Sequence, residues 1–236
     1  MQEGNAMNTR MKMDIEALKK TYVKPDKVQA QKILRYVKDF ENEKDRFAFI
    51  GMGGTISSGY NPNKESLFPF PCHVSRTLIE DLQGKFGINT DTFASAELSS
   101  KDSRDLENAD LEALLDFVSS IENERILITC GTYLLTKIAE ILIDTDVVQD
   151  KIVAVTGSML PTGFTFSDSG MNIMSAITAV DLAKKHELKP SHNVFVVFHG
   201  QVYTTLEEIK ALNLHNEATD KLVIEYPLTS VPYKRG

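Results

Sequence analysis

Short apolar runs alternate along the chain with stretches in which apolar residues recur every three or four positions. The runs predict buried strands at 47–50, 92–98, 125–129, 151–156 and 193–198. The stretches with helical spacing predict helices at 73–86, 110–121, 132–143, 168–185 and 204–214. This alternation is typical of βαβ units, in which right-handed crossovers make neighbouring strands parallel. The pattern therefore predicts an α/β fold in a single domain: a three-layer, mostly parallel, doubly wound sheet with helices on both faces.

The two ends of the chain lack this alternation. Residues 1 to about 22 are polar, rich in Met and Lys and without a clear period, so we expect them to be loosely ordered. Apolar residues at helical spacing predict an amphipathic helix at about 26–40, with Asp26 as its N-cap. The expected organisation is an N-terminal extension at 1–45, an α/β domain at 46–214 and a tail at 215–236, with an added strand at 222–226.

Composition and charge exclude several classes of protein. The chain has 236 residues, 25% of them charged, and a formal net charge of -7, which argues against nucleic-acid or anionic-membrane partners. No apolar run approaches the roughly 20 residues of a membrane span, and residues 1–20 do not resemble a signal peptide. Two cysteines, Cys72 and Cys130, without a CxxC motif predict neither a disulfide framework nor a metal site. We therefore expect a reduced, cytoplasmic protein.

The first predicted strand ends in a turn rich in glycine. Gly51, Gly53 and Gly54 follow the apolar run at once, and Thr55 comes next. Open α/β sheets bind ligands beyond the carboxyl ends of their strands, which is where this hydroxyl falls. Taken alone, the turn favours the simpler interpretation, a threonine that only forms local hydrogen bonds. The loop that follows, 57–71, is long enough to act as a lid.

Hydroxyls recur beside glycine at two later strand ends. Thr132 follows the strand at 125–129, and Ser158 follows the strand at 151–156. Together with Thr55 they predict a polar pocket lined by hydroxyls and backbone N–H groups. Neither a G-x-S-x-G motif nor an evident serine–histidine pair occurs, so a threonine nucleophile needs lysine or tyrosine as its activator.

Other conspicuous residues favour ordinary structural roles. His199 reads as a loop or core histidine, and Cys130 as a small buried side chain. The segment 51–54 lacks a third glycine at position 56, so it does not predict a dinucleotide site, and we expect no cofactor.

Four segments in order resemble the bacterial-type L-asparaginase family. They are Gly53-Gly54-Thr55-Ile56, Asp102-Ser103-Arg104-Asp105-Leu106, Thr129-Cys130-Gly131-Thr132, and Val155-Thr156-Gly157-Ser158-Met159-Leu160-Pro161 with Ser167-Asp168 and Asn172. The resemblance spans about residues 46–213. It implies an amidohydrolase that converts the side-chain amide of asparagine, or a related small amide, to the acid and ammonia, without a cofactor.

The resemblance also implies roles for individual residues. Thr55 would be the nucleophile, Thr132 and Lys151 the second catalytic pair, and Tyr60 the tyrosine of the lid. Substrate-binding residues would be Gly54, Asp102, Ser103, Arg104, Asp105, Gly131, Tyr133 and Ser158. The resemblance also implies that the protein is a homo-oligomer and that its substrate is a small amide or amino acid.

Some positions depart from the family pattern. Tyr133 stands where the family has an aspartate that binds the substrate's α-amino group, and Cys130 replaces a histidine. The sequence ends about where the family's smaller C-terminal domain begins, so we expect the N-terminal helix or another subunit to close the crevice. These departures leave two alternatives open: a non-catalytic ligand-binding or regulatory module, and hydrolysis of a different amide in which Tyr133 contributes stacking or a hydroxyl contact.

Overall fold

The computed structural model describes residues 13–37, 40–61, 66–69, 84, 92–186, 190, 192–212, 215–216 and 221–222. For residues 60–61, 66–69, 215–216 and 221–222 the description covers the backbone only. The expected helix at 73–86 lies outside these residues, apart from Gly84.

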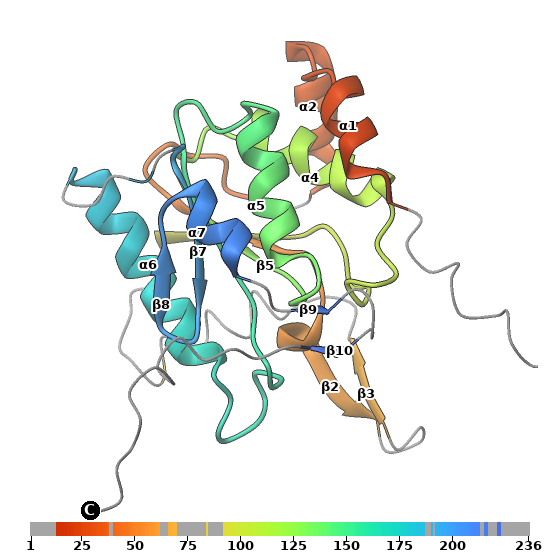
Figure 1. The fold of residues 1–236 in the computed structure, drawn as a ribbon. Helices are drawn as coiled ribbons and strands as arrows, with labels where there is room; N and C mark the ends of the chain where they lie inside the picture. The colour runs from red at the N-terminus through yellow and green to blue at the C-terminus, as the bar shows by residue number, and fades with distance from the viewer. Residues whose placement is uncertain are drawn as a thin grey trace, which may run out of the picture.

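A mixed sheet forms the centre of the molecule (Figure 1). In the described chain its order is β4 (Phe93–Glu97), β1 (Phe47–Gly51), β5 (Arg125–Thr129), β6 (Ile152–Thr156), β7 (Val194–Phe198) and β8 (Gln201–Tyr203). All neighbouring pairs are parallel except β7 and β8. The predicted strands and the mostly parallel sheet are therefore confirmed, and β8 is an addition that the sequence pattern did not predict.

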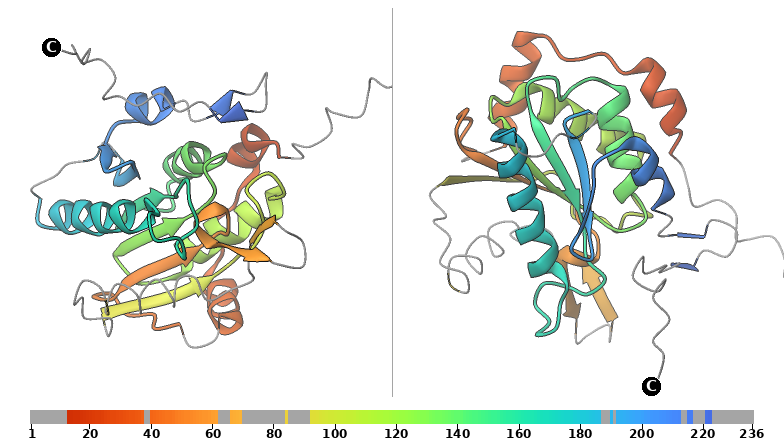
Figure 2. Two further views of the ribbon diagram at one scale, coloured as in Figure 1. Left: turned by 90° about the horizontal axis from the view of Figure 1, so that it is seen from below. Right: turned by 60° about the vertical axis from the view of Figure 1, so that its left-hand side comes forward.

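Helices cover both faces of this sheet, which confirms the three-layer arrangement (Figure 2). Between the strands run α4 (Asn108–Ser120), α5 (Leu135–Asp144) and α6 (Ser169–Lys184), and α7 (Leu206–Ala211) follows β8. Helix α6 packs on one face with Phe47, Phe49 and Phe195. On the other face α4, α5 and α7 contribute to a larger apolar core. Because both faces are covered, the central strands are apolar throughout rather than alternating.

The N-terminal segment is more ordered than its composition predicts. Residues 15–21, expected to be loose, form helix α1 (Ile15–Thr21), which packs on α4 and α5 and buries Leu18. Asp14 caps this helix by accepting from the backbone N–H of Ala17. The cap and the burial of Leu18 stabilise a helix that the pattern of apolar residues does not predict. The expected helix at 26–40 is confirmed as α2 (Lys27–Tyr36), with Asp26 and Gln29 forming a capping box.

Two small hairpins lie outside the main sheet. The stretch expected to be a loop contains the 3₁₀ helix η1 (Thr55–Ser57) and the antiparallel strands β2 (Ser58–Asn61) and β3 (Ser66–Pro69). Near the C-terminus, β9 (His215–Asn216) pairs with β10 (Lys221–Leu222). The strand expected at 222–226 overlaps this pair at Leu222, and its other residues lie outside the described chain. The helix expected at 204–214 is observed as the shorter α7, Leu206–Ala211. It begins after Thr205, whose side chain caps it by accepting from the Glu208 N–H. No described helix is long and apolar enough to cross a membrane.

The layer formed by α6 gives a test of the core. Phe195 is completely buried under α6, so Phe195→Ala should lower the free energy of unfolding by about 3–5 kcal/mol by leaving a cavity. Phe166 is 90% exposed, and the same change there should alter the free energy by less than about 0.5 kcal/mol. Urea unfolding followed by circular dichroism measures both, and equal effects would contradict the packing described.

Candidate active site

The order of strands creates one place in the sheet where a ligand crevice is expected. Strand β1 has β4 on one side and β5 on the other, and the chain continues from β5 to β6 and β7. This reversal of direction beside β1 is a topological switch point, where connections leave neighbouring strands toward opposite sides. Thr55 follows β1 and Thr132 follows β5, so both hydroxyls lie at the carboxyl ends of the strands that flank the switch point.

Three loops meet at these strand ends with very little space between their backbones. A Cβ atom placed on Gly54 would lie 2.3 Å from the Cα of Gly131, and one on Gly131 would lie 2.4 Å from the Oγ of Ser103. The N–H of Gly54 also donates to the carbonyl oxygen of Lys101 over 3.0 Å. Gly54 has a φ of 82°, a conformation that side chains disfavour. The structure therefore brings together Gly54, Ser103 and Gly131, and with them the adjacent residues Thr55 and Thr132.

The two threonine hydroxyls at the switch point are available to a ligand. Thr132 is 9% exposed and Thr55 is partly exposed. Among the described residues, neither hydroxyl has a hydrogen-bond partner, whereas Thr156 in the adjacent strand end donates to the carbonyl of Val197. A hydroxyl without a protein partner beside closely packed backbone can donate to, accept from or attack a bound molecule.

The segment after β4 supplies charged groups beside these hydroxyls. Asp102 accepts from the backbone N–H and the guanidinium of Arg104, with an Nε to Oδ1 distance of 3.0 Å. The same guanidinium lies 5.3 Å from the centre of the Tyr133 ring, which is a cation–π contact. Asp105 is exposed and closes a turn to the Asp102 carbonyl. Of the expected substrate-binding residues, Ser103 is therefore buried against Gly131, while Arg104 and Tyr133 form a pair next to it.

Ser158 lies just beyond the end of β6, as expected, but its hydroxyl is committed to a backbone carbonyl. It is 1% exposed, and its hydroxyl donates to the carbonyl of Leu160 over 2.5 Å. This bond stabilises the loop between β6 and α6, and substrate binding by Ser158 stays a prediction.

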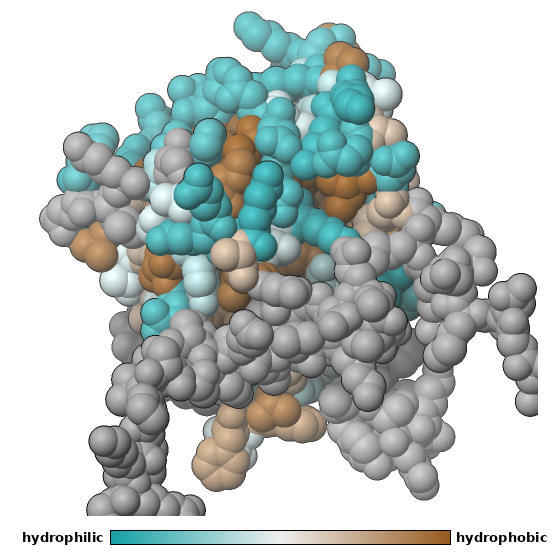
Figure 3. Space-filling view, in the orientation of Figure 1, coloured by the Kyte–Doolittle hydropathy of each residue, from teal (hydrophilic) through white to brown (hydrophobic). Residues whose placement is uncertain are grey.

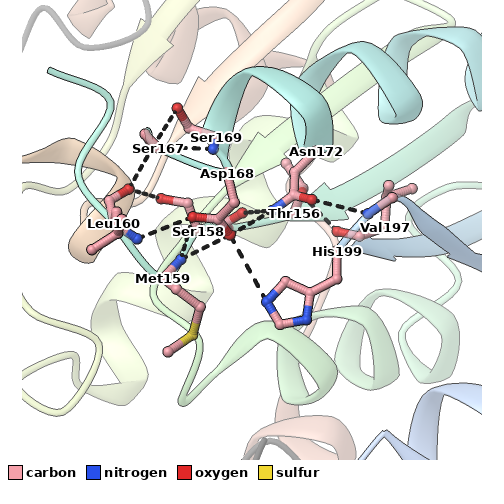
Figure 4. A network of polar contacts seen from close by, with 12 residues as sticks. Thr156, Ser158, Met159, Leu160, Ser167, Asp168, Ser169, Asn172, Val197 and His199 are labelled. Carbon is pink, nitrogen blue, oxygen red and sulfur yellow. Dashed lines mark hydrogen bonds and ion pairs between the residues drawn. The ribbon is translucent and has the colours of Figure 1, made fainter. Parts of the chain in front are cut away.

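That loop is held by a polar network that the sequence did not reveal (Figure 4). The Asp168 carboxylate accepts from the backbone N–H groups of Met159 and Leu160 and from the side-chain amide of Asn172. Asn172 in turn donates to the Gly157 carbonyl and accepts from the Gly200 N–H. The available signal was the spacing of Asp168 and Asn172, four residues apart at the start of a helix, which places both side chains on one face.

His199 borders the same network from the end of β7. With Gly200 it forms a two-residue turn into β8, and both have positive φ, 50° and 71°. Its Nε2 lies 4.0 Å from Oδ2 of Asp168, and its ring packs 4.2 Å from the centre of the Phe198 ring. Burial lowers the pKa of His199, an effect that the nearby Asp168 carboxylate opposes.

Lys151 does not approach Thr132. It immediately precedes β6, and β6 is parallel to β5, so Lys151 lies at the amino end of the sheet and Thr132 beyond its carboxyl end. Five residues of strand separate these ends by about 16 Å. Burial lowers the pKa of Lys151, as does the neighbouring charge of Lys24 at the same edge. The expected catalytic pair of Thr132 and Lys151 is therefore corrected, because the direction of β6 separates them.

Two further sequence expectations concern Tyr60 and Cys130. The side chain of Tyr60 lies outside the described residues, and its backbone pairs with Leu67 in the β2–β3 hairpin. Cys130 is fully buried, and burial raises the pKa of its thiol, which agrees with a small core residue rather than a reactive one.

The β6–α6 loop beside these strand ends exposes apolar side chains, and the described residues include no evident metal site. In Figure 3 one patch of apolar residues is visible at the lower end of the molecule, below atoms drawn in grey, and β7 points toward this end in Figure 1. The β6–α6 loop contributes Leu160, Phe164 and Phe166 as exposed apolar side chains. Within the described part of the chain, no group of three or more His, Cys, Asp or Glu residues could hold a metal ion.

Comparison with known proteins identifies relatives of this fold. A family model described as "Asparaginase, N-terminal" matches residues 46–221, well over half of the chain. Among solved structures, L-asparaginase I from Vibrio cholerae is 17% identical, with a TM-score of 0.50, over 68% of this chain and 46% of its own. No curated protein matches the chain.

Two other solved structures match with lower TM-scores. The probable cytoplasmic L-asparaginase from Campylobacter jejuni is 19% identical, with a TM-score of 0.49, over 67% of this chain and 46% of its own. The thermostable L-asparaginase from Thermococcus kodakarensis is 22% identical, with a TM-score of 0.48, over 66% and 45%. The chain thus spans less than half the length of these solved relatives.

The close approach of Gly54 to Gly131 can be tested by adding one methyl group. Gly54→Ala should lower the free energy of unfolding by about 2 kcal/mol or more, because the Cβ meets backbone and φ is positive. Gly163→Ala is the matched control: no atom lies within 4 Å of its added Cβ, so the change should stay below about 0.5 kcal/mol. Urea unfolding compares the two, and an unchanged Gly54→Ala midpoint would refute the contact.

The burial of His199 predicts a dependence of stability on pH. Its pKa in the folded state lies below the ordinary value of 6.5, so the unfolded chain binds more protons there and stability falls as pH drops below 6.5. His199→Asn, which tolerates positive φ, should reduce this loss in thermal melts at pH 7 and pH 5. His186→Asn is the control, since His186 also has a positive φ, of 62°. If both variants retain the full pH dependence, His199 is not its source.

Proposed function

The chain belongs to the asparaginase family through its match to the N-terminal domain, and from this premise we propose that it is an amidohydrolase. It hydrolyses the side-chain amide of asparagine or of a related small amide to the acid and ammonia. The observation that supports this most is the Thr55 hydroxyl, which has no protein partner among the described residues and stands beside the Gly54–Gly131 contact at the switch point.

Thr55 acts as the nucleophile in this proposal. Its oxygen attacks the carbonyl carbon of the amide, and the hydroxyl proton leaves to a base as the tetrahedral intermediate forms. Backbone N–H groups near Thr55 and Thr132 donate to the developing oxyanion. The intermediate collapses with protonation of the nitrogen, so that ammonia leaves and an ester to Thr55 remains. Water then attacks the ester, which releases the acid and restores the hydroxyl.

In this proposal, groups other than Lys151 carry out the proton transfers. Thr132, whose hydroxyl also lacks a partner among the described residues, follows the closely packed Gly131, and in this proposal it contacts the amide nitrogen or the attacking water. Tyr60, in the hairpin that follows Thr55, remains the predicted group that accepts the Thr55 proton. A base within hydrogen-bond reach supplies typically 10²–10⁴-fold in rate, so the assignment of this group has a measurable consequence.

The substrate's remaining groups would contact the segment after β4. Asp102, Ser103 and Asp105 stay as predicted binding residues, of which Ser103 lies directly against Gly131. Tyr133, in contact with Arg104, offers an aromatic face and a hydroxyl to the substrate in place of a carboxylate. An amide that lacks an α-ammonium group would lose less at such a site than asparagine, which keeps hydrolysis of a different amide open.

A second function, binding without turnover, is favoured by the same residues. Lys151 is at the opposite end of the sheet from Thr132, and Tyr133 provides no negative charge. A module of this kind would raise its unfolding temperature in the presence of an amide or amino acid without releasing ammonia, because ligands that bind only the native state stabilise it. Homo-oligomeric assembly and a cytoplasmic location remain predictions that accompany the main proposal.

The role of Thr55 predicts a large loss of activity on its removal. Thr55→Ala should reduce ammonia release by at least about 1,000-fold, because it removes the oxygen that forms the ester in this proposal. The assay measures ammonia from asparagine, glutamine and succinamic acid, the last of which lacks the α-ammonium group. Thr132→Val should reduce the rate by about 100-fold or more through loss of a proton-transfer group.

Lys151 provides the control for these variants. Lys151→Met removes a charge at the far end of the sheet, so its rate should stay within about twofold of the wild type. Full activity in Thr55→Ala would contradict the nucleophile assignment. Absence of ammonia release by the wild type from all three amides would favour the binding function instead.

A further inference from the structure

A side chain distant in the sequence holds the turn that carries Thr55. The hydroxyl of Thr162, in the β6–α6 loop, donates to the carbonyl oxygen of Ile56 over 2.8 Å, and its backbone N–H donates to the same oxygen over 3.3 Å. Ile56 is fully buried and directly follows Thr55 in η1. The last carbonyls of a helical turn lack partners within the turn, so Thr162 supplies the donors that η1 itself cannot.

The opposite side of the turn is fixed by other bonds. The N–H of Gly54 donates to Lys101, and the carbonyl of Gly54 accepts from the N–H of Ser57 and the hydroxyl of Ser58. These contacts hold the start of the turn against the segment after β4. Thr162 therefore holds its centre, on the side toward the β6–α6 loop.

The loop can act as a support because it is fixed near both ends. Asp168 accepts from two backbone N–H groups at Met159 and Leu160, with distances of 3.0 and 3.1 Å. Asn172 joins the start of the loop at Gly157 to the β7–β8 turn at Gly200 (Figure 4). The network thus connects α6 and β7 to the loop, and Thr162 extends this support to the turn at the end of β1.

We infer that Thr162 is a positioning residue, which fixes the Ile56 carbonyl and so sets the place of the Thr55 hydroxyl against Gly131. This inference deepens the proposed function and rests on it for its catalytic consequence. A reacting atom displaced by about 1 Å can cost up to 100-fold in rate, which is why a bond one residue from the nucleophile affects turnover. Thr162 itself contacts no reacting atom.

Two substitutions separate the hydrogen bond from the volume of the side chain. Thr162→Val keeps the shape and removes the donor, whereas Thr162→Ser keeps the donor. The matched control is Thr145→Val: the Thr145 hydroxyl also donates to a carbonyl, that of Ile141, over 2.6 Å, but at the end of α5 near the amino edge of the sheet. Thermal melts check that all three variants fold.

The first measurement does not depend on any substrate. Hydrogen exchange of the peptide 51–61, which contains the Ser57 and Ser58 amides of the turn, should be about tenfold faster in Thr162→Val, because local opening becomes easier. Thr162→Ser and Thr145→Val should exchange as the wild type does. Unchanged exchange in Thr162→Val would overturn the inference.

The second measurement concerns catalysis with the amide that releases ammonia fastest. Thr162→Val should lower kcat by about tenfold, as expected for the loss of one hydrogen bond, and leave KM within about twofold, with Thr162→Ser restoring kcat. Equal kcat in Thr162→Val and the wild type would overturn the inference while leaving the proposed function intact. If the wild type releases no ammonia, the proposed function fails, and hydrogen exchange alone decides whether Thr162 positions the turn.

Discussion

The close approach of two backbones at the switch point is the constraint on which the candidate site depends. Gly54 and Gly131 leave no room for a Cβ between them, and this contact brings the turn after β1 against the turn after β5. Each glycine is followed by a threonine, so Thr55 and Thr132 come next to this contact at the same edge of the sheet. Neither hydroxyl is used by the described part of the protein, whereas Ser158 and Thr156 at neighbouring strand ends are committed to backbone carbonyls. This difference is the reason why the proposal assigns the chemistry to Thr55 and Thr132.

A polar network supports this edge from the α6 side. Asp168 and Asn172 satisfy backbone groups of a loop that no regular ladder could satisfy, and fully satisfied networks of this kind specify one conformation. The loop exposes Leu160, Phe164 and Phe166 to solvent and yet is fixed at its base. Because the base of the loop is fixed, Thr162 is held where it can bond the Ile56 carbonyl and support the Thr55 turn.

The sequence predicted the fold better than the site. Strands β1, β5, β6 and β7 were evident because strands covered on both faces are continuously apolar. Helix α1 was missed because it depends on a cap and a single buried leucine. The β2–β3 hairpin was missed because its strands pair within a stretch whose composition is typical of a loop. Lys151 was misplaced for a physical reason: a motif match gives order along the chain, but only the direction of β6 shows that Lys151 and Ser158 stand at opposite edges.

Direct detection of the covalent intermediate tests the central proposal, that Thr55 forms the ester. The wild-type protein is mixed with the amide that yields most ammonia, quenched in acid during turnover and digested for mass spectrometry. The proposal predicts the mass of the acyl group on the peptide that contains Gly54 and Thr55, with fragmentation that assigns it to Thr55. Ammonia release with the acyl group on a different side chain would contradict it.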